Sequence, residues 1–158
     1  MSSYKTQSIR SVALVGHGAA GKTSLIEALL FQAEAIPSKG SVERGTTVCD
    51  FEALEKEAGH SLASAIVNFG YENTHIHLVD TPGYPDFAGQ AIAALAGVDT
   101  ALVVVNAQTG IELMTERMMR YAAERKLCRM IVINKIDADN LDLPGLVADI
   151  RARFGKHC

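Results

Sequence analysis

Apolar and polar residues alternate in blocks along this chain, and the spacing within each block predicts one type of element. Short apolar runs bounded by glycine or polar residues predict buried strands, at residues 11–15, 101–105 and 129–133. Two further runs separated by a turn predict a hairpin, with strands at 62–69 and 74–79 and a turn at 70–73. Apolar residues at helical spacing predict helices, at 22–35, 85–96, 111–126 and 143–154.

The order of these elements predicts the fold class. A strand and a helix come first, a long polar loop with one helical turn follows at 38–58, and the hairpin precedes alternating helices and strands. Strands that are apolar on both faces are typical of a parallel sheet covered by helices. We therefore expect an α/β fold with a mostly parallel sheet, one antiparallel edge hairpin and helices on both faces.

Composition limits the class of protein further. The chain has 158 residues, of which 48% are apolar, and its net charge is −3. This favours a single folded domain and gives no basic balance that would indicate sequence-specific DNA binding. No apolar run approaches the ~18–20 residues that cross a bilayer, so we expect no membrane contact. The spacing of Cys49, Cys128 and Cys158 is not that of a disulfide framework or a metal site. We therefore expect reduced thiols and a cytoplasmic protein.

A phosphate-binding motif joins the first predicted strand to the first predicted helix. Residues 16–23 read Gly-His-Gly-Ala-Ala-Gly-Lys-Thr and fit the pattern G-x-x-x-x-G-K-[ST] of P-loop NTPases. Loop N–H groups and the helix N-terminus converge on phosphate oxygens in this arrangement. Lys22 is expected to bring its charge to the β- and γ-phosphates, and Thr23 to bring a hydroxyl to Mg²⁺. The predicted nucleotide-binding residues here are Gly18, Ala19, Ala20, Gly21, Lys22, Thr23 and Ser24.

A second motif predicts which base is bound. Residues 134–137 read Asn-Lys-Ile-Asp and follow a predicted strand, at the sheet edge where α/β proteins bind ligands. The Asp137 carboxylate can accept hydrogen bonds from both N1–H and the N2 amino group of guanine, whereas adenine has no such donor pair. Asn134 and Lys135 are expected to hold the loop and cover the base. The motif therefore favours GTP and GDP over an ATP-using reaction.

A third motif, Asp-Thr-Pro-Gly at 80–83, lies between the other two and also follows a predicted strand. Asp80 is expected to hold Mg²⁺ through water, and the Gly83 N–H to sense the γ-phosphate and release it after hydrolysis. A second match at 142–145 follows the base motif and is therefore in the wrong order.

These motifs resemble those of the translational GTPases. The run Asp-Thr-Pro-Gly-Tyr-Pro-Asp-Phe at 80–87, with Gly-Ser-Val-Glu at 40–43 and the acidic run after Asp50, is similar to elongation factor G and its bacterial elongation factor G-like paralogues. The resemblance covers roughly residues 9–155. It implies the G domain of a longer protein that hydrolyses GTP with Mg²⁺ and is stimulated by the ribosome.

The resemblance also implies a switch I loop at 36–61 and a switch II segment at 80–90. Arg-Gly-Thr-Thr at 44–47 looks like the family's switch I motif, but alignment through the acidic run places that motif at 58–61. The alignment thus favours Ser61 over Thr46 or Thr47 as the switch hydroxyl that binds Mg²⁺. A serine hydroxyl can still coordinate the ion.

The chain departs from the family where the reaction takes place. The resemblance puts Lys22, Gly83 and Tyr84 at the reacting end of the nucleotide, and Tyr84 replaces the family's water-positioning histidine. A phenol with a pKa of about 10 is a poor base at pH 7, so we expect Tyr84 to orient water or to stack. Gly18 and Ala19 replace a bulky and an acidic loop residue, and His60 is expected to be a solvated loop histidine. We expect slow intrinsic hydrolysis; the alternative is a GTP/GDP switch without useful turnover.

The end of the chain affects the domain prediction. A complete G domain of this family has a further strand and an S-A-x guanine loop after the base motif, and residues 138–158 contain neither. We therefore expect residues 1–158 to be a single truncated, incomplete G domain with no second domain, which binds GTP more weakly than a longer chain.

Overall fold

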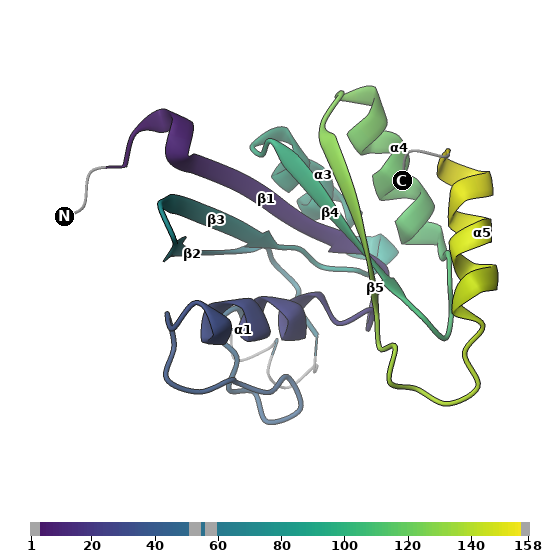
Figure 1. The fold of residues 1–158 in the computed structure, drawn as a ribbon, viewed down its shortest axis with the longest axis horizontal. Helices are drawn as coiled ribbons and strands as arrows, with labels where there is room; N and C mark the ends of the chain where they lie inside the picture. Colours follow the sequence, from purple (N-terminus) through teal and green to yellow (C-terminus); the bar gives the residue numbers. More distant parts are fainter. Residues whose placement is uncertain (1–3, 51–54, 56–59, 156–158) are drawn as a thin grey trace.

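The computed structural model describes residues 4–50, 55 and 60–155. They form a five-stranded sheet in the order β2-β3-β1-β4-β5 (Figure 1). Only β2 and β3 pair antiparallel, and the remaining neighbours are parallel. This confirms the predicted mostly parallel sheet with one antiparallel edge hairpin. The strands are β1 (Ile9–Gly16), β2 (Ala65–Tyr71), β3 (Thr74–Asp80), β4 (Thr100–Asn106) and β5 (Cys128–Asn134).

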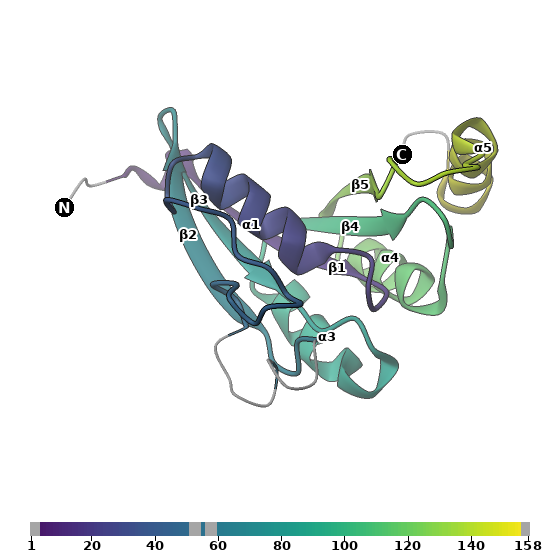
Figure 2. The ribbon, with the colours of Figure 1, turned by 90° about the horizontal axis from the view of Figure 1, so that it is seen from below.

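Helices cover both faces of the sheet, as predicted. Figure 2 shows α1 on one face and α3 and α4 on the other, and α5 lies beside α4 next to β5. An Arg153–Glu116 ion pair joins α5 to α4. The α-helices are α1 (Lys22–Gln32), α3 (Ala88–Ala96), α4 (Leu113–Glu124) and α5 (Leu143–Phe154), and short 3-10 helices occupy η1 (Thr6–Ser8) and η2 (Pro85–Phe87).

Alternate residues of the central strands build two cores. Side chains of β1 and β4 that include Ala13 and Val103 pack with Met118 of α4 and its neighbours on one face. Leu14 and the strand residues that point to the same side as Leu14 pack with Ile26 of α1 on the other face. Successive strand residues point to opposite faces, so a strand covered on both sides is apolar throughout.

The hairpin differs from the prediction at both ends. The strand predicted from residue 62 begins at Ala65, because the N–H groups of Leu62 and Ala63 donate to the Glu55 carboxylate at 2.9 and 3.1 Å rather than to a neighbouring strand. The turn predicted at 70–73 is shorter, since strand pairing continues to Tyr71 and Thr74.

Helix ends also differ from the prediction. The helix predicted to reach residue 35 ends at Gln32, and Glu34 adopts a left-handed φ of 56° that a helix cannot contain. The segment predicted as one helix from residue 85 starts as η2 and becomes α-helical at Ala88. The helix predicted at 111–126 is confined to Leu113–Glu124.

Some predictions fall on residues 51–54, 56–59 and 156–158, which lie outside the described residues. These include the helical turn expected before residue 58, the first part of the motif aligned at 58–61, and Cys158. Within the described part of the chain, no helix combines the length and apolar character that a membrane crossing requires.

Candidate nucleotide-binding site

Three loops meet at the carboxyl edge of the sheet. The phosphate loop connects β1 to α1, the Asp-Thr-Pro-Gly motif begins at the last residue of β3, and the Asn-Lys-Ile-Asp motif begins at the last residue of β5. Parallel strands bring their carboxyl ends to one edge, which is where open α/β sheets bind ligands. A pocket at this edge is lined by Gly18, Ala19, Gly21, Lys22, Thr23, Ser24, Val42, Glu43, His60, Ser61, Thr81, Gly83, Tyr84 and Lys135.

The phosphate loop is tied to the end of β5. Gly21 has a φ of 90°, which favours glycine, and a Cβ added there would overlap the Asn134 amide nitrogen. That amide donates a hydrogen bond to the Ala20 carbonyl oxygen at 3.0 Å. Residues far apart in sequence therefore form one rigid corner of the pocket.

Lys22 is almost fully buried at the start of α1. Its Nζ atom donates to the carbonyl oxygens of His17 at 2.8 Å and Gly16 at 3.3 Å. Burial lowers the pKa of Lys22 to about 8, while the nearby carboxylates of Asp80 and Glu112 oppose this shift. The ammonium group thus lies within the loop that would surround a phosphate.

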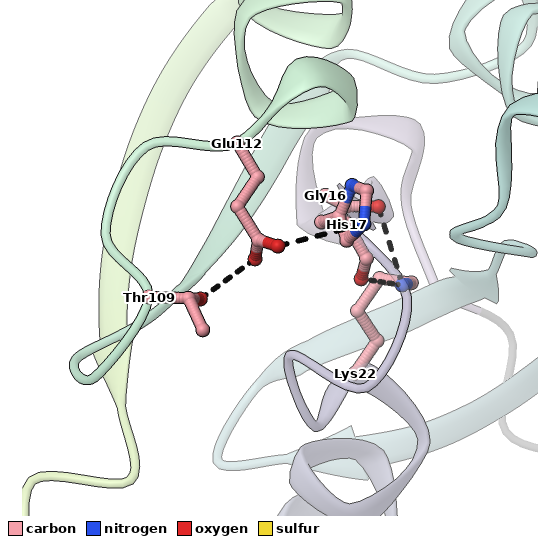
Figure 3. Close-up of polar contacts among 5 residues, drawn as sticks. All are labelled: Gly16, His17, Lys22, Thr109 and Glu112. Atoms are coloured by element: carbon pink, nitrogen blue, oxygen red, sulfur yellow. Dashed lines mark hydrogen bonds and ion pairs between the residues drawn. The ribbon is translucent and has the colours of Figure 1, made fainter.

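The phosphate loop also contacts the segment before α4 (Figure 3). His17 Nε2 lies 3.5 Å from Glu112 Oε1, and Thr109 donates a hydrogen bond to Glu112 Oε2 at 2.7 Å. This contact was not predictable from the sequence, because His17 occupies a variable position of the phosphate-loop pattern.

Oxygen atoms suited to a magnesium ion gather beside Lys22. Thr23 Oγ1 donates to Asp80 Oδ2 at 2.6 Å, and Ser61 Oγ lies 3.4 Å from Thr23 Oγ1. Asp80 is fully buried, its Oδ1 atom has no hydrogen-bond partner among the described residues, and burial raises its pKa to about 6. An unpartnered buried carboxylate oxygen beside hydroxyls fits Mg²⁺, which prefers oxygen ligands and retains water and phosphate ligands as well.

The two candidate places for the switch I hydroxyl are separated in the structure. Ser61 lines the pocket and donates a hydrogen bond to Asp50 Oδ1 at 3.0 Å. Thr47 donates to the other oxygen of the same carboxylate at 2.8 Å, and Thr46 Oγ1 accepts from the Ser41 N–H at 3.0 Å. The threonines thus hold the loop together, and Ser61 is the residue that faces Thr23.

Glu27 is a structural residue of this region that the sequence analysis missed. It is 1% exposed on α1, and its carboxylate accepts hydrogen bonds from the N–H groups of Gly40 at 2.7 Å and Val48 at 2.6 Å. A charged residue beside Ile26 on the buried face of α1 was the available signal. Glu27 attaches the loop at 36–61 to the helix that follows the phosphate loop.

The segment that follows β3, predicted to be switch II, is packed directly on the phosphate loop. Thr81 donates a hydrogen bond to the Leu14 carbonyl oxygen at 2.7 Å, which fixes the chain leaving β3. A Cβ added to Gly83 would lie 2.6 Å from the Gly18 nitrogen and would overlap Lys22 Nζ. Position 83 therefore has no room for a side chain.

The base motif is only partly brought into the pocket. Lys135 lines it, whereas Asp137 is exposed and does not. Asp137 is exposed in the turn that follows β5.

The glycine-rich loop between the first strand and first helix of a mostly parallel sheet defines a domain with the fold of the P-loop NTPases. The model of the elongation factor Tu GTP binding domain matches residues 7–157, and the chain belongs to this family of translational GTPases. The predicted resemblance to translational GTPases is thereby confirmed.

Individual relatives agree with this assignment. The chain is 41% identical over 129 residues to the elongation factor G-like protein of Mycobacterium tuberculosis, which covers 82% of this chain and 18% of that protein. It is 35% identical over 155 residues to the mitochondrial ribosome-releasing factor 2 of Drosophila ananassae, covering 98% of this chain and 21% of the relative. A crystal structure from Thermus thermophilus superposes with a TM-score of 0.89 at 39% identity, covering 93% of this chain and 22% of that one.

The chain therefore spans only about a fifth of the length of these relatives. The region that it shares with them includes the GTP binding domain matched at residues 7–157.

Proposed function

We propose that this domain binds GTP and GDP with Mg²⁺ and hydrolyses GTP to GDP and phosphate by in-line attack of water. The observation that carries the proposal is the joining of three ordered motifs at one sheet edge, with Asn134 bonded to the phosphate loop at Ala20. The phosphate loop and Lys22 would neutralise the β- and γ-phosphates.

Thr23, Ser61 and Asp80 would hold the magnesium ion, which would supply charge neutralisation between the β- and γ-phosphates. Gly83 lies beside Lys22 and Gly18, and its N–H would donate a hydrogen bond to the γ-phosphate. Loss of that bond after hydrolysis would release switch II from the phosphate loop.

We propose that Asp137 gives the domain its specificity for guanine, and a variant in which an amide replaces the carboxylate tests this. The variant Asp137→Asn should lose affinity for GDP and gain affinity for xanthosine diphosphate, since an amide can accept from N1–H and donate to the C2 carbonyl of xanthine. Asp139→Asn, a neighbouring exposed aspartate, is the matched control. Equal affinity of the unaltered chain for ATP and GTP would refute guanine specificity.

The ribosome is the proposed partner, and the cytoplasm the proposed location. One relative is named a ribosome-releasing factor, and the matching family is that of an elongation factor. We propose that the ribosome accelerates phosphate release. Single-turnover release is measured with and without ribosomes, on this chain and on the longer protein that the family resemblance implies.

A second candidate function is a GTP/GDP switch that changes partners without useful turnover. It is favoured by Tyr84, which stands where the family has a histidine and whose phenol is a poor base at pH 7. Phosphate release stimulated by ribosomes would refute it. The variant Tyr84→His then shows how much of the rate depends on that position.

A further inference from the structure

Three segments meet in an aromatic contact at one end of the pocket. Tyr84 of switch II lies over Gly18 of the phosphate loop, and the His60 ring packs against Tyr84 with ring centroids 4.7 Å apart. The sequence predicts a solvated loop histidine at position 60, but His60 is only partly exposed and also lies 6.4 Å from the Phe87 ring. We call Tyr84 and His60 the aromatic cap.

Gly18 provides the surface on which the cap rests. A Cβ added to Gly18 would lie 2.9 Å from Tyr84 Cζ and 3.0 Å from Cε1, closer than side chains approach one another. Gly18 does not have a positive φ, so its backbone conformation is one that alanine can adopt. There is therefore no room for a side chain beneath the tyrosine ring, and any side chain at position 18 would displace Tyr84.

The orientation of the ring brings a polar group to the pocket. The hydroxyl-bearing carbon Cζ is the ring atom closest to the Gly18 position, so the phenol end lies over the phosphate loop. Lys22 and Gly83 line the same pocket. A tyrosine hydroxyl is neutral at pH 7 and donates a hydrogen bond, which anionic phosphate oxygens accept strongly.

We propose that Tyr84 is a γ-phosphate-binding residue that makes this domain prefer GTP over GDP, and that Gly18 and His60 hold its ring in position. This inference rests on the proposed binding of guanine nucleotides. In place of a water-positioning histidine, the chain would thus use a neutral donor whose position depends on a glycine and a second ring.

The test compares the affinity for a non-hydrolysable GTP analogue with the affinity for GDP. Tyr84→Phe keeps the ring and removes the donor, and should lower this affinity ratio at least about tenfold, as expected for a hydrogen bond to a charged group. Gly18→Ala should lower the ratio to a similar extent by displacing the ring. Adding Gly18→Ala to Tyr84→Ala should lower the affinity ratio little further, because the tyrosine ring is already absent. Tyr71→Phe, at an exposed tyrosine of β2, is the control and should keep the ratio.

His60→Ala provides a second way to loosen the ring if Gly18→Ala fails to fold, and it should lower the same ratio. An unchanged ratio in Tyr84→Phe overturns the role of the hydroxyl. Equal, additive losses from Gly18→Ala and Tyr84→Ala overturn the coupling between these positions.

The cap is also tested without nucleotide, which separates this inference from the proposed function. In the nucleotide-free chain, the His60 ring protons should show a ring-current shift in the NMR spectrum that persists in Tyr84→Phe and falls in Tyr84→Ala to the smaller contribution of the more distant Phe87 ring. An undiminished shift in Tyr84→Ala overturns the cap whether or not nucleotide binds. Failure of the unaltered chain to bind either nucleotide refutes both the proposed function and the nucleotide preference, while a normal shift would still support the cap.

Discussion

Glu27 gives a prediction about how the loop at 36–61 is held. Its buried carboxylate accepts the N–H groups of Gly40 and Val48, one on each oxygen. Glu27→Gln preserves the size of the side chain but leaves one acceptor oxygen, and places an amide NH₂ against the N–H of the other partner. The variant therefore loses one hydrogen bond and leaves a buried donor unsatisfied.

The size of the effect follows from the charge of the acceptor. A hydrogen bond to a charged group contributes roughly 1.5–3 kcal/mol, and an unsatisfied buried donor costs a similar amount. Some of this loss is recovered because a neutral amide is easier to bury than a carboxylate. We expect the free energy that holds the loop closed to fall by about 2 kcal/mol in Glu27→Gln and by about 4 kcal/mol in Glu27→Ala, which loses both hydrogen bonds.

Amide hydrogen exchange measures this effect at the residues concerned. A loss of about 2 kcal/mol should accelerate exchange of the Gly40 and Val48 amides by about 30-fold where the loop opens locally. Glu124→Gln, an exposed position of α4, is the control and should leave both amides unchanged. Unchanged exchange at Gly40 and Val48 in Glu27→Gln would refute the anchoring role of Glu27.

Two substitutions and one labelling experiment test neighbouring features of the site and the core. Gly21→Ala should abolish nucleotide binding measured by calorimetry, because φ is left-handed there and the new methyl group would overlap the Asn134 amide; retained affinity would contradict the tight corner. In metal-free protein, the pKa of Asp80 is raised to about 6 by burial, so its ionised carboxylate destabilises the fold above about pH 6, and this penalty is lost as the pH falls toward 3.8. Asp80→Asn should thus stabilise the chain in EDTA by up to about 3 kcal/mol at pH 7.5 and by less at pH 5 in urea unfolding, and no gain at pH 7.5 would count against it. Burial and nearby carboxylates raise the pKa of the Cys49 thiol well above its usual range, so at pH 8 a thiol reagent should label exposed Cys128 and spare Cys49 until the chain unfolds, as read by mass spectrometry.

The agreement between sequence and structure differs among elements for identifiable reasons. The strand β4 was predictable because both of its faces are buried, which makes every residue from Ala101 to Val105 apolar. The start of β2 was not predictable, since Leu62 is apolar but its N–H donates to Glu55 rather than to a strand. Element ends depend on where individual backbone groups find partners, and apolar spacing does not report this.

The order and chemistry of the three nucleotide motifs were determined by the sequence alone. Each motif combines local residues whose geometry is set by a single strand end and the turn that follows, and the order of the motifs along the chain excludes the second match at 142–145. The family and the mostly parallel sheet follow from the same local signals.

Only the tertiary structure decided which distant residues complete the site. The alignment favours Ser61 over Thr47, but the contact of Ser61 with Thr23 and that of Tyr84 with Gly18 arise only in the folded chain, across long separations in sequence. Such contacts depend on how loops fold over the sheet edge and on gaps smaller than one methyl group. A linear pattern records the type of side chain at each position, whereas the space left between two side chains exists only once the chain has folded.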